Sequence, residues 1–528
     1  MPMTPESPAT RPAHAPDHPD FARRGLLGAL AAAALLGSRV ALAQQPTPFQ
    51  RALPIPPVQT GTPRSDGRLG YALRMTAGSS ELVAGTRTPT WGYNGSWLGP
   101  ALRIPRGKPV AITLHNALDQ ASTTHWHGAH VPGDQDGGPQ SIVEPGESRH
   151  YAFALDQPGA TLWYHPHTDC LTGPQVYAGL AGLLIVDDGI DRRIGLPHTW
   201  GVDDIPLVLQ DRRIDADGRL VYMNQQGDSM GMKGDRFLVN GREQPYVNVP
   251  AQWVRLRLLN GSNARLYNVA LADRRPFQVI ASDAGLLPRP VPLQQLLIGP
   301  GERYEILLDC RKLQGRTLVL RSESGDIVPE LALSPMLADR FDRSGFDLLQ
   351  LRVTAPSGTP GRLPSRLVDV EPLHAGAPPR RFSMQGAVAN PKPSPMEATC
   401  SLAPGPGGMS TGLHGLDMFS INHQYMDIWV INQRVQRGAT EIWEIGNDGH
   451  MLHPFHFHGT SFQILDRGGF PLPDQERGWK DVVLVRPFEK VRVVARFDQP
   501  AGDDHPFMYH CHILEHEDNG MMGQFTVS

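Results

Sequence analysis

The sequence predicts an all-β protein built from repeated domains, and two observations support that prediction. The first is composition: the 528 residues include 55 glycines and 50 prolines, which favour many turns between short strands. The second is a pattern that occurs three times, starting at Tyr93, Val239 and Ile421. Hydrophobic residues make up 40% of the chain and charged residues 19%, a balance typical of a folded globular protein.

Each copy of the repeat contains an asparagine-bearing turn, a polar stretch and a strand in which apolar and polar residues alternate. The alternating strands read VAITLHN, VRLRLLN and EIWEIGN, and each ends with or close to an asparagine. Alternation with a period of two is typical of a half-buried strand. Recurrence at long intervals predicts three copies of one β-domain. Chance similarity among generic strands is the alternative, and the shared asparagines argue against it.

The repeats also predict the domain limits. Domain 1 is expected at residues 45–189, domain 2 at 191–354 and domain 3 at 381–528, with a proline- and glycine-rich linker at 355–380. Within domain 3, residues 390–415 have the composition of a long surface loop. A chain of this length exceeds one ordinary hydrophobic core, which agrees with several domains.

Residues 1–43 have the parts of an export signal. Arg23 and Arg24 precede a short apolar run, and the small residues of Ala41-Leu42-Ala43, at positions 41 and 43, supply a cleavage site before Gln44. The apolar run is too short to span a bilayer as a stable helix. The arginine pair favours the twin-arginine route over an ordinary secretory signal. We therefore expect export by the twin-arginine machinery, a periplasmic location and a mature chain without a membrane span.

Charge and cysteine content exclude other classes of protein. The formal net charge is −4 and the pI is about 6.6, and no long basic run is present, so we expect no nucleic-acid partner. Four cysteines are few for an exported chain of this size. If Cys511 binds a metal, then Cys170, Cys310 and Cys400 allow at most one disulfide, and the sequence does not decide which.

Four His-x-His pairs carry the strongest functional signal. Residues i and i+2 of a strand project to the same face, so each pair offers two imidazoles side by side. One pair alone is weak evidence, because paired surface histidines are common. Two pairs in domain 1 and two in domain 3 predict a cluster of metal ions. The pairs are His125/His127, His165/His167, His456/His458 and His510/His512.

The C-terminal stretch HCHILEHEDNGMM indicates which metal. In an extended strand Cys511 faces away from His510 and His512, so it can bind one metal while its neighbours bind others. His453, His516 and a following methionine could complete the site of the cysteine. Two histidines, a cysteine and a distant methionine form the ligand set of a blue-copper centre. Structural zinc prefers four firm nitrogen or sulfur ligands, which makes zinc the weaker alternative.

Together, HWHG, WYHPH, HPFHFHG and HCHILEHEDNGMM resemble the three-domain multicopper oxidases over nearly the whole mature chain. The similarity is strongest to bacterial periplasmic cuprous oxidases of the copper-efflux type and to laccases. The resemblance implies three cupredoxin-like Greek-key β-barrel domains, with a copper cluster between the first and the third. It also implies four copper ions per chain: one type 1, one type 2 and two type 3.

Matched motif by motif, the resemblance assigns the ligands. It gives the type 1 copper to His453, Cys511, His516 and an axial Met521, with Met522 in the core. It gives the type 2 copper to His125 and His456. The type 3 pair falls to His127, His165, His167, His458, His510 and His512.

The resemblance further implies that a reductant gives single electrons to the type 1 copper. Electrons would pass through Cys511 to the cluster, where dioxygen is reduced to water. Asp136 and Glu517 resemble the acids that relay protons in the family; a loop acid and a hydrogen-bond partner are their plainer interpretations. Trp126 and Trp163 flank ligands and are expected to pack around the cluster.

The reducing substrate follows less directly from the sequence. Cuprous oxidases carry a methionine-rich insert, whereas methionines here are scattered at 384, 396, 409, 418 and 426. Met451 keeps the family position of a substrate-copper ligand, and Asp448 lies one residue before the expected acid. We predict a monomeric oxidase of Cu(I), phenols or both that serves copper tolerance. The alternatives are a laccase without a copper role and a non-enzymatic scaffold or copper store, which the full ligand set disfavours.

Overall fold

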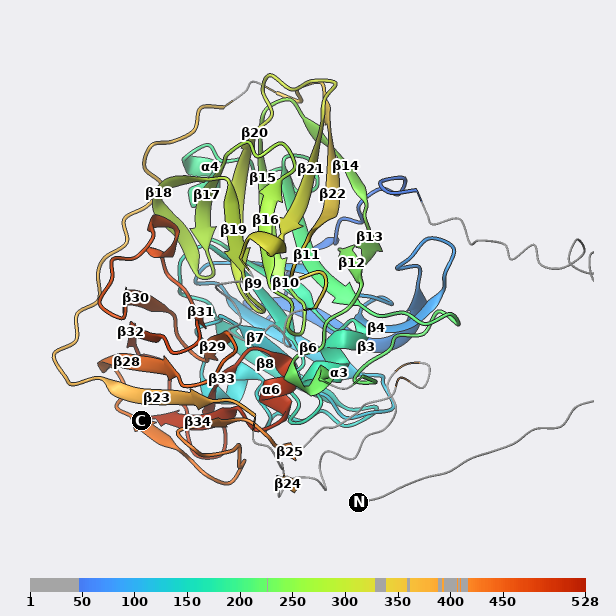
Figure 1. Cartoon of the computed structure of the whole chain (residues 1–528). Coiled ribbons are helices and arrows are strands. Elements are labelled where there is room, and N and C mark those ends of the chain that lie inside the picture. Colours follow the sequence, from blue (N-terminus) through green and yellow to red (C-terminus); the bar gives the residue numbers. More distant parts are fainter. Residues whose placement is uncertain are drawn as a thin grey trace, which may run out of the picture. The chain divides into compact units, whose positions relative to one another are not determined.

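The strands fall into three successive groups, and each group forms two main β-sheets (Figure 1). The computed structural model describes residues 47–225, 227–327, 339–358, 361–387, 392–393, 406, 409 and 416–528. Pro48–Ser528 form one unit. The expected export signal at residues 1–43 lies outside the described residues. So do Met396, Cys400 and most of the predicted loop at 390–415.

The first group lies between residues 58 and 187. One sheet has the order β1-β5-β10-β9-β7, and the other has the order β2-β3-β6-β8, with β4 paired to β3. Its strands are β1 (Val58–Thr60), β2 (Thr62–Pro63), β3 (Leu69–Ser80), β4 (Thr88–Tyr93), β5 (Ala101–Pro105), β6 (Pro109–Asn116), β7 (His125–His127), β8 (Ser148–Ala154), β9 (Ala160–His165) and β10 (Gly182–Asp187).

The second group lies between residues 204 and 354. Its sheets have the orders β13-β12-β11-β15-β20-β17-β18 and β14-β22-β21-β16-β19. Its strands are β11 (Asp204–Arg212), β12 (Arg236–Val239), β13 (Arg242–Glu243), β14 (Tyr246–Pro250), β15 (Trp253–Asn260), β16 (Tyr267–Leu271), β17 (Phe277–Ser282), β18 (Gly285–Leu293), β19 (Gln295–Ile298), β20 (Arg303–Asp309), β21 (Thr317–Glu323) and β22 (Gly345–Thr354).

The third group lies between residues 380 and 527. Its sheets have the orders β26-β23-β28-β32-β30 and β27-β34-β33-β29-β31. Its strands are β23 (Arg380–Gln385), β26 (Ser420–Ile421), β27 (Gln433–Val435), β28 (Thr440–Asn447), β29 (His453–Phe457), β30 (Phe462–Arg467), β31 (Val482–Val485), β32 (Lys490–Arg496), β33 (Phe507–Cys511) and β34 (Met522–Val527); β24 (Lys392–Pro393) and β25 (Leu416–Asp417) pair separately.

Helices are short in the described part of the chain, as expected for the all-β fold that the sequence predicts. They are α2 (Gly133–Asp136), α3 (Thr172–Ala178), α4 (Ile190–Arg193), α6 (Leu514–Asp518), η1 (Asp228–Met230), η2 (Ser324–Asp326) and η3 (Asp474–Glu476). None of the helices described is long and apolar enough to cross a membrane.

The alternation in the sequence is the physical basis of these sheets. In β6, positions 110, 112, 114 and 116 are buried, and the residues between them are partly exposed. Each strand group has its own large apolar core, as expected when amphipathic strands cover each other. The all-β prediction is confirmed. The exact domain limits at 45, 189, 191, 354 and 381 stay predictions, as does the linker at 355–380.

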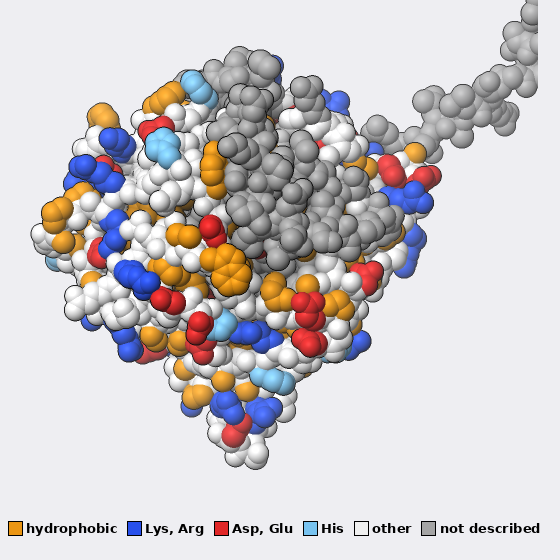
Figure 2. Space-filling model, turned by 90° about the horizontal axis from the view of Figure 1, so that it is seen from below, with side chains coloured by type: hydrophobic (Ala, Val, Ile, Leu, Met, Phe, Trp, Pro, Cys, Tyr) orange, Lys and Arg blue, Asp and Glu red, His pale blue; other side chains and the backbone are white. Residues whose placement is uncertain are grey.

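Acidic and basic side chains are interspersed on the face shown in Figure 2. That face therefore shows no broad basic patch among its described residues. This view agrees with the near-neutral balance of charges in the sequence.

Candidate metal centre

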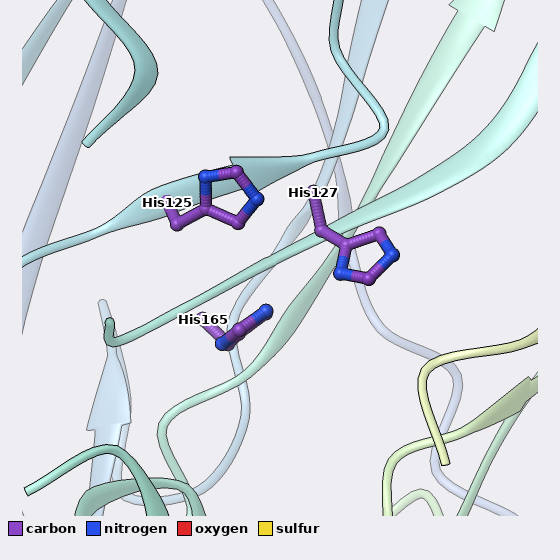
Figure 3. Close-up of side chains that lie close together, drawn as sticks. All are labelled: His125, His127 and His165. Carbon is purple, nitrogen blue, oxygen red and sulfur yellow. The ribbon is translucent and has the colours of Figure 1, made fainter. Parts of the chain in front are cut away.

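Two pairs of neighbouring strands bring the His-x-His motifs together. In the first strand group, β7 and β9 are antiparallel, with His125 opposite His165 and His127 opposite Trp163. Figure 3 shows the rings of His125, His127 and His165 coming from these two strands. In the third group, β29 and β33 are antiparallel, with His456 opposite His510. Both histidines of the first pair lie within β7 and share one face of it. In the other three pairs the first histidine lies in a strand, and the second follows just after that strand ends.

All eight paired histidines are buried and lie in one cluster between the first and third strand groups. Their exposed fractions do not exceed 1%. Nε2 of His510 lies 3.3 Å from Nε2 of His167 and 3.4 Å from Nε2 of His458. Nε2 of His512 lies 3.3 Å from Nδ1 of His127. Ring nitrogens that converge in this way from several sides are well placed to share a metal ion.

The outer ring nitrogens donate hydrogen bonds, which fixes the tautomers. Nδ1 of His125 donates to the carbonyl oxygen of Asp136 at 3.0 Å, and Nδ1 of His165 to that of Pro166 at 2.7 Å. Nδ1 of His456 donates to the carbonyl oxygen of Asp481 at 2.6 Å. The Nε2 atoms of these three histidines are buried and have no hydrogen-bond partner among the described residues. Buried, unpaired acceptor nitrogens of this kind fit a metal ion.

His127 has its two ring nitrogens in the opposite roles. Its Nε2 lies 3.1 Å from Oδ1 of Asp481, and its Nδ1 faces His512. The proton is therefore assigned to Nε2, and Nδ1 is the nitrogen available to a metal. Sequence reasoning missed Asp481, because a single acid in GWKDVV carries no ligand spacing that would single it out.

A second, smaller group surrounds Cys511. Its Sγ lies 3.4 Å from Nδ1 of His453 and 3.6 Å from Nδ1 of His516. The two Nδ1 atoms lie 3.2 Å apart. Met521 is fully buried in the same core cluster as Cys511. Met522 packs instead with Met426 and Met508, as expected for a core residue.

Burial makes charged states of this second group costly. It lowers the pKa of His453 to about 3 and raises the pKa of the Cys511 thiol well above its usual range. The imidazole is therefore neutral and ready to donate a lone pair. A thiolate at Cys511 requires a compensating cation, which a bound copper ion would supply. A thiolate, two imidazoles and a thioether are the ligands of a blue-copper centre, and soft sulfur ligands in general favour copper.

Two buried carboxylates lie beside the histidine cluster. Oδ2 of Asp136 accepts a hydrogen bond from Nδ1 of His458 at 2.7 Å. Oε2 of Glu517 lies 3.1 Å from Nδ1 of His510, and Oε1 lies 3.5 Å from Nδ1 of His167. Burial raises the pKa of Glu517, but His167 and His510 outweigh it and lower the value to about 2.

The structure corrects the expectation for one of the two flanking tryptophans. Trp163 stacks on His165 with ring centroids 4.0 Å apart, as expected. Trp126 instead packs on Tyr151 and Tyr164 in the core of the first strand group. The prediction for Trp126 was wrong because the middle residue of HWH points to the opposite face of β7.

Other predicted residues lie outside the two clusters. Asp448 is exposed and accepts a hydrogen bond from Ser383. Met451 is partly buried, and its carbonyl oxygen accepts a hydrogen bond from Asn447 at 2.6 Å. Cys170 is disulfide-bonded, whereas Cys310 and Cys511 are free thiols.

Sequence models of multicopper oxidases match residues 74–190, 209–323 and 414–528. The multicopper oxidase mco of Staphylococcus haemolyticus is 33% identical over 477 residues, covering 90% of this chain and 92% of that protein. The cell division protein FtsP of Escherichia coli is 35% identical over 503 residues, covering 94% and 96%. The structure of the laccase-like multi-copper oxidase CueO from Ochrobactrum sp. has 36% identity and a TM-score of 0.76, covering 90% and 100%.

Paired β-sheets in three successive groups, with buried imidazole clusters and a His/Cys/His group, define a cupredoxin-like protein whose clusters are consistent with copper sites. The chain belongs to the multicopper oxidase family.

Proposed function

We propose that this protein is an oxidase that takes single electrons from Cu(I) or phenolic donors and passes them to dioxygen. Four copper ions, when bound, would supply the redox chemistry: one-electron oxidation of the donor and four-electron reduction of dioxygen to water. The type 1 ligands would be His453, Cys511, His516 and Met521, and the type 2 ligands His125 and His456. The type 3 ligands would be His127, His165, His167, His458, His510 and His512.

One observation carries the proposal: Cys511 joins the two ligand groups. Its sulfur lies with His453 and His516, whereas the imidazoles of its neighbours His510 and His512 lie in the histidine cluster. A covalent path of a few bonds therefore links a site that accepts one electron at a time with a site that has room for several metals. A copper store needs no such link, and an inert scaffold needs no buried ligand set.

Asp136 and Glu517 are proposed to relay protons to the reduction site. Their carboxylate oxygens contact the Nδ1 atoms of His458 and His510. Each acid therefore touches a ring whose other nitrogen, Nε2, faces the cluster. Buried acids in such contacts can hold and pass a proton without an exposed side chain.

Copper tolerance is the proposed physiological role, with Cu(I) as the preferred substrate and Met451 and Asp448 as candidate substrate contacts. Phenol oxidation is the second candidate activity. The related protein from Ochrobactrum sp. is described as acting on lignin model compounds and lignosulfonate. We further propose that residues 1–43 direct export to the periplasm by the twin-arginine route and that the mature protein is a monomer.

The test compares oxygen consumption by the copper-loaded mature chain with Cu(I) and with a phenolic donor, beside Cys511→Ser. If Cu(I) is oxidised faster than the phenol and Cys511→Ser is inactive, the copper role is supported. Faster turnover of the phenol without added copper identifies a laccase-type enzyme. A wild-type protein that binds four copper ions but consumes no oxygen contradicts the enzymatic proposal and favours a non-enzymatic role. One relative, FtsP of Escherichia coli, is named a cell division protein.

A further inference from the structure

The second strand group supplies none of the proposed copper ligands, yet it reaches the histidine cluster through one acid of the third group. We infer that Asp481 is a positioning residue for the trinuclear copper site and that Arg303 and Asp283 of the second group hold it in place. The inference rests on the proposed function, because it concerns how the chain orients the type 2 and type 3 ligands.

Asp481 accepts hydrogen bonds from two histidines, through Nε2 of one ring and Nδ1 of the other. Its carboxylate accepts a hydrogen bond from Nε2 of His127 at 3.1 Å, which leaves Nδ1 free for the metal. Its carbonyl oxygen accepts one from Nδ1 of His456 at 2.6 Å, which leaves Nε2 free. One residue therefore selects the tautomers of two neighbouring rings, which stack with centroids 3.8 Å apart.

Asp481 is placed to orient ligands rather than to bind copper itself. Its carboxylate lies close enough to His127 and His456 to form a ligand group with them. However, Arg303 occupies both oxygens, with Nη1 2.6 Å from Oδ1 and Nη2 2.6 Å from Oδ2. A bidentate guanidinium neutralises the carboxylate and leaves it the role of hydrogen-bond acceptor.

Arg303 is itself held from several directions. Its Nη1 donates to the carbonyl oxygen of Gly301 at 3.0 Å, and Nη2 to that of Asp283 at 2.9 Å. Its Nε donates at 3.0 Å to the carbonyl oxygen of Thr161, on the strand that carries His165. The side chain is fully buried. Arg303 thus connects all three strand groups at the cluster.

Asp283 fixes the backbone from which Asp481 projects. Its Oδ2 accepts hydrogen bonds from the backbone nitrogens of Asp481 at 3.3 Å and Val482 at 3.2 Å. Its Oδ1 accepts one from the backbone nitrogen of Arg303 at 2.8 Å. Lys480 balances the charge, with its ammonium 2.9 Å from Asp283 and 2.9 Å from Glu302.

The ion pair of Asp481 and Arg303 explains why a glycine follows His127 in the motif HWHG. Gly128 has φ +84°, and a Cβ there would lie 2.5 Å from Oδ2 of Asp481 and 2.9 Å from Nη2 of Arg303. The loop after His127 is therefore shaped around the ion pair. A buried network of five charges carries a large desolvation cost, so its position against two ligand histidines favours a role in orientation over a role in stability alone.

The experiment uses the copper-loaded mature protein and the variant Asp481→Asn. The amide keeps the size of the side chain but loses its charge and presents a donor to Arg303 or to His127. We expect affinity for the trinuclear copper ions to fall roughly 10–100-fold. The readouts are copper per chain, the electron paramagnetic resonance signal of type 2 copper and the near-ultraviolet band of the type 3 pair. The blue type 1 absorption should persist and reports correct folding of the third group.

Asp211→Asn is the matched control, because Asp211 is also buried against an arginine, with Oδ2 2.7 Å from Nε of Arg265. It should keep wild-type copper content and trinuclear spectra. The inference is overturned if Asp481→Asn keeps these spectra, or if both variants lose copper equally. If Asp481→Asn also loses the type 1 colour, the third strand group has not folded correctly and this variant is uninformative. Arg303→Lys then replaces it, judged by the same spectra, because lysine keeps the positive charge but cannot make the bidentate contact. A wild type that reaches four copper ions without consuming oxygen contradicts the proposed function alone.

Discussion

His456 and His510 lie directly opposite each other on antiparallel strands β29 and β33, with ring centroids 5.4 Å apart. The next pair in the register is Phe455 and Cys511, which therefore point to the other side of the sheet. This one-residue step separates the two proposed copper sites. It also means that each site can be altered without removing a ligand from the other.

Replacing Cys511 tests this separation. Cys511→Ser removes the thiolate from the group that Cys511 forms with His453 and His516, so the blue thiolate-to-copper absorption should disappear. Copper content should fall from four to three ions per chain, and oxygen consumption with any donor should be lost. The matched control is Cys310→Ser, because Cys310 is the other free, buried cysteine that the structure describes, and it lies in the second strand group. A blue Cys511→Ser protein would contradict the type 1 assignment.

Asp136→Asn tests proton delivery. The amide can still accept a hydrogen bond from Nδ1 of His458 but cannot release a proton, so reoxidation by dioxygen should slow by about 10–100-fold. Bleaching of the blue colour by a donor without oxygen should stay at the wild-type rate, because that step needs no proton at the cluster. Stopped-flow absorbance separates the two steps. Equal slowing of both would exclude a specific relay role.

Gly301→Ala tests the contact between the second strand group and the cluster. Gly301 has φ +81°, and a Cβ there would lie 2.8 Å from a ring carbon of His512. Gly315 has φ +78° with nothing within 4 Å, so Gly315→Ala carries the same backbone strain without the clash. Gly315→Ala should lose about 1 kcal/mol of stability from backbone strain alone, and Gly301→Ala should lose more because the clash adds to that strain. Only Gly301→Ala should weaken the near-ultraviolet type 3 band, and equal spectra for the two variants would contradict this.

Asp191 predicts an acid-dependent loss of stability. Burial raises its pKa, but Arg255 and Arg257, at 2.5 Å and 3.3 Å, outweigh it and lower the value to about 2. Because the folded-state pKa is depressed, the ionised acid stabilises the fold above about pH 4. That contribution is lost as the pH falls from about 4 to about 2.

Asp191→Asn should therefore lower the free energy of unfolding by about 1–2 kcal/mol near neutral pH and by less near pH 2. Thermal melting of both proteins across this pH range measures the difference. Asp156→Asn is the control, because Asp156 is 80% exposed in its ion pair with Arg106 and should change little. Parallel pH curves for wild type and Asp191→Asn would show that another group governs the transition.

The fold class could be predicted from the sequence because strand alternation is a local property. The burial of alternate residues in β6 reproduces the pattern of VAITLHN. The same period explains why His510 and His512 lie apart from Cys511, and also why Trp126 points away from the cluster. Motif spacing identified the histidines from the sequence, because the two members of each pair lie within or just beyond one strand.

The sequence by itself determined an all-β chain with three repeats, four His-x-His pairs and a cysteine set between two of those histidines. The tertiary structure decided which nitrogen of each ring faces its neighbours, because hydrogen-bond partners such as Asp481 lie hundreds of residues from His127. It also decided that Arg303 and Gly301 of the ligand-free second group contact the cluster. These contacts depend on how three separately patterned domains pack, and packing between distant segments leaves no periodic trace in a single sequence.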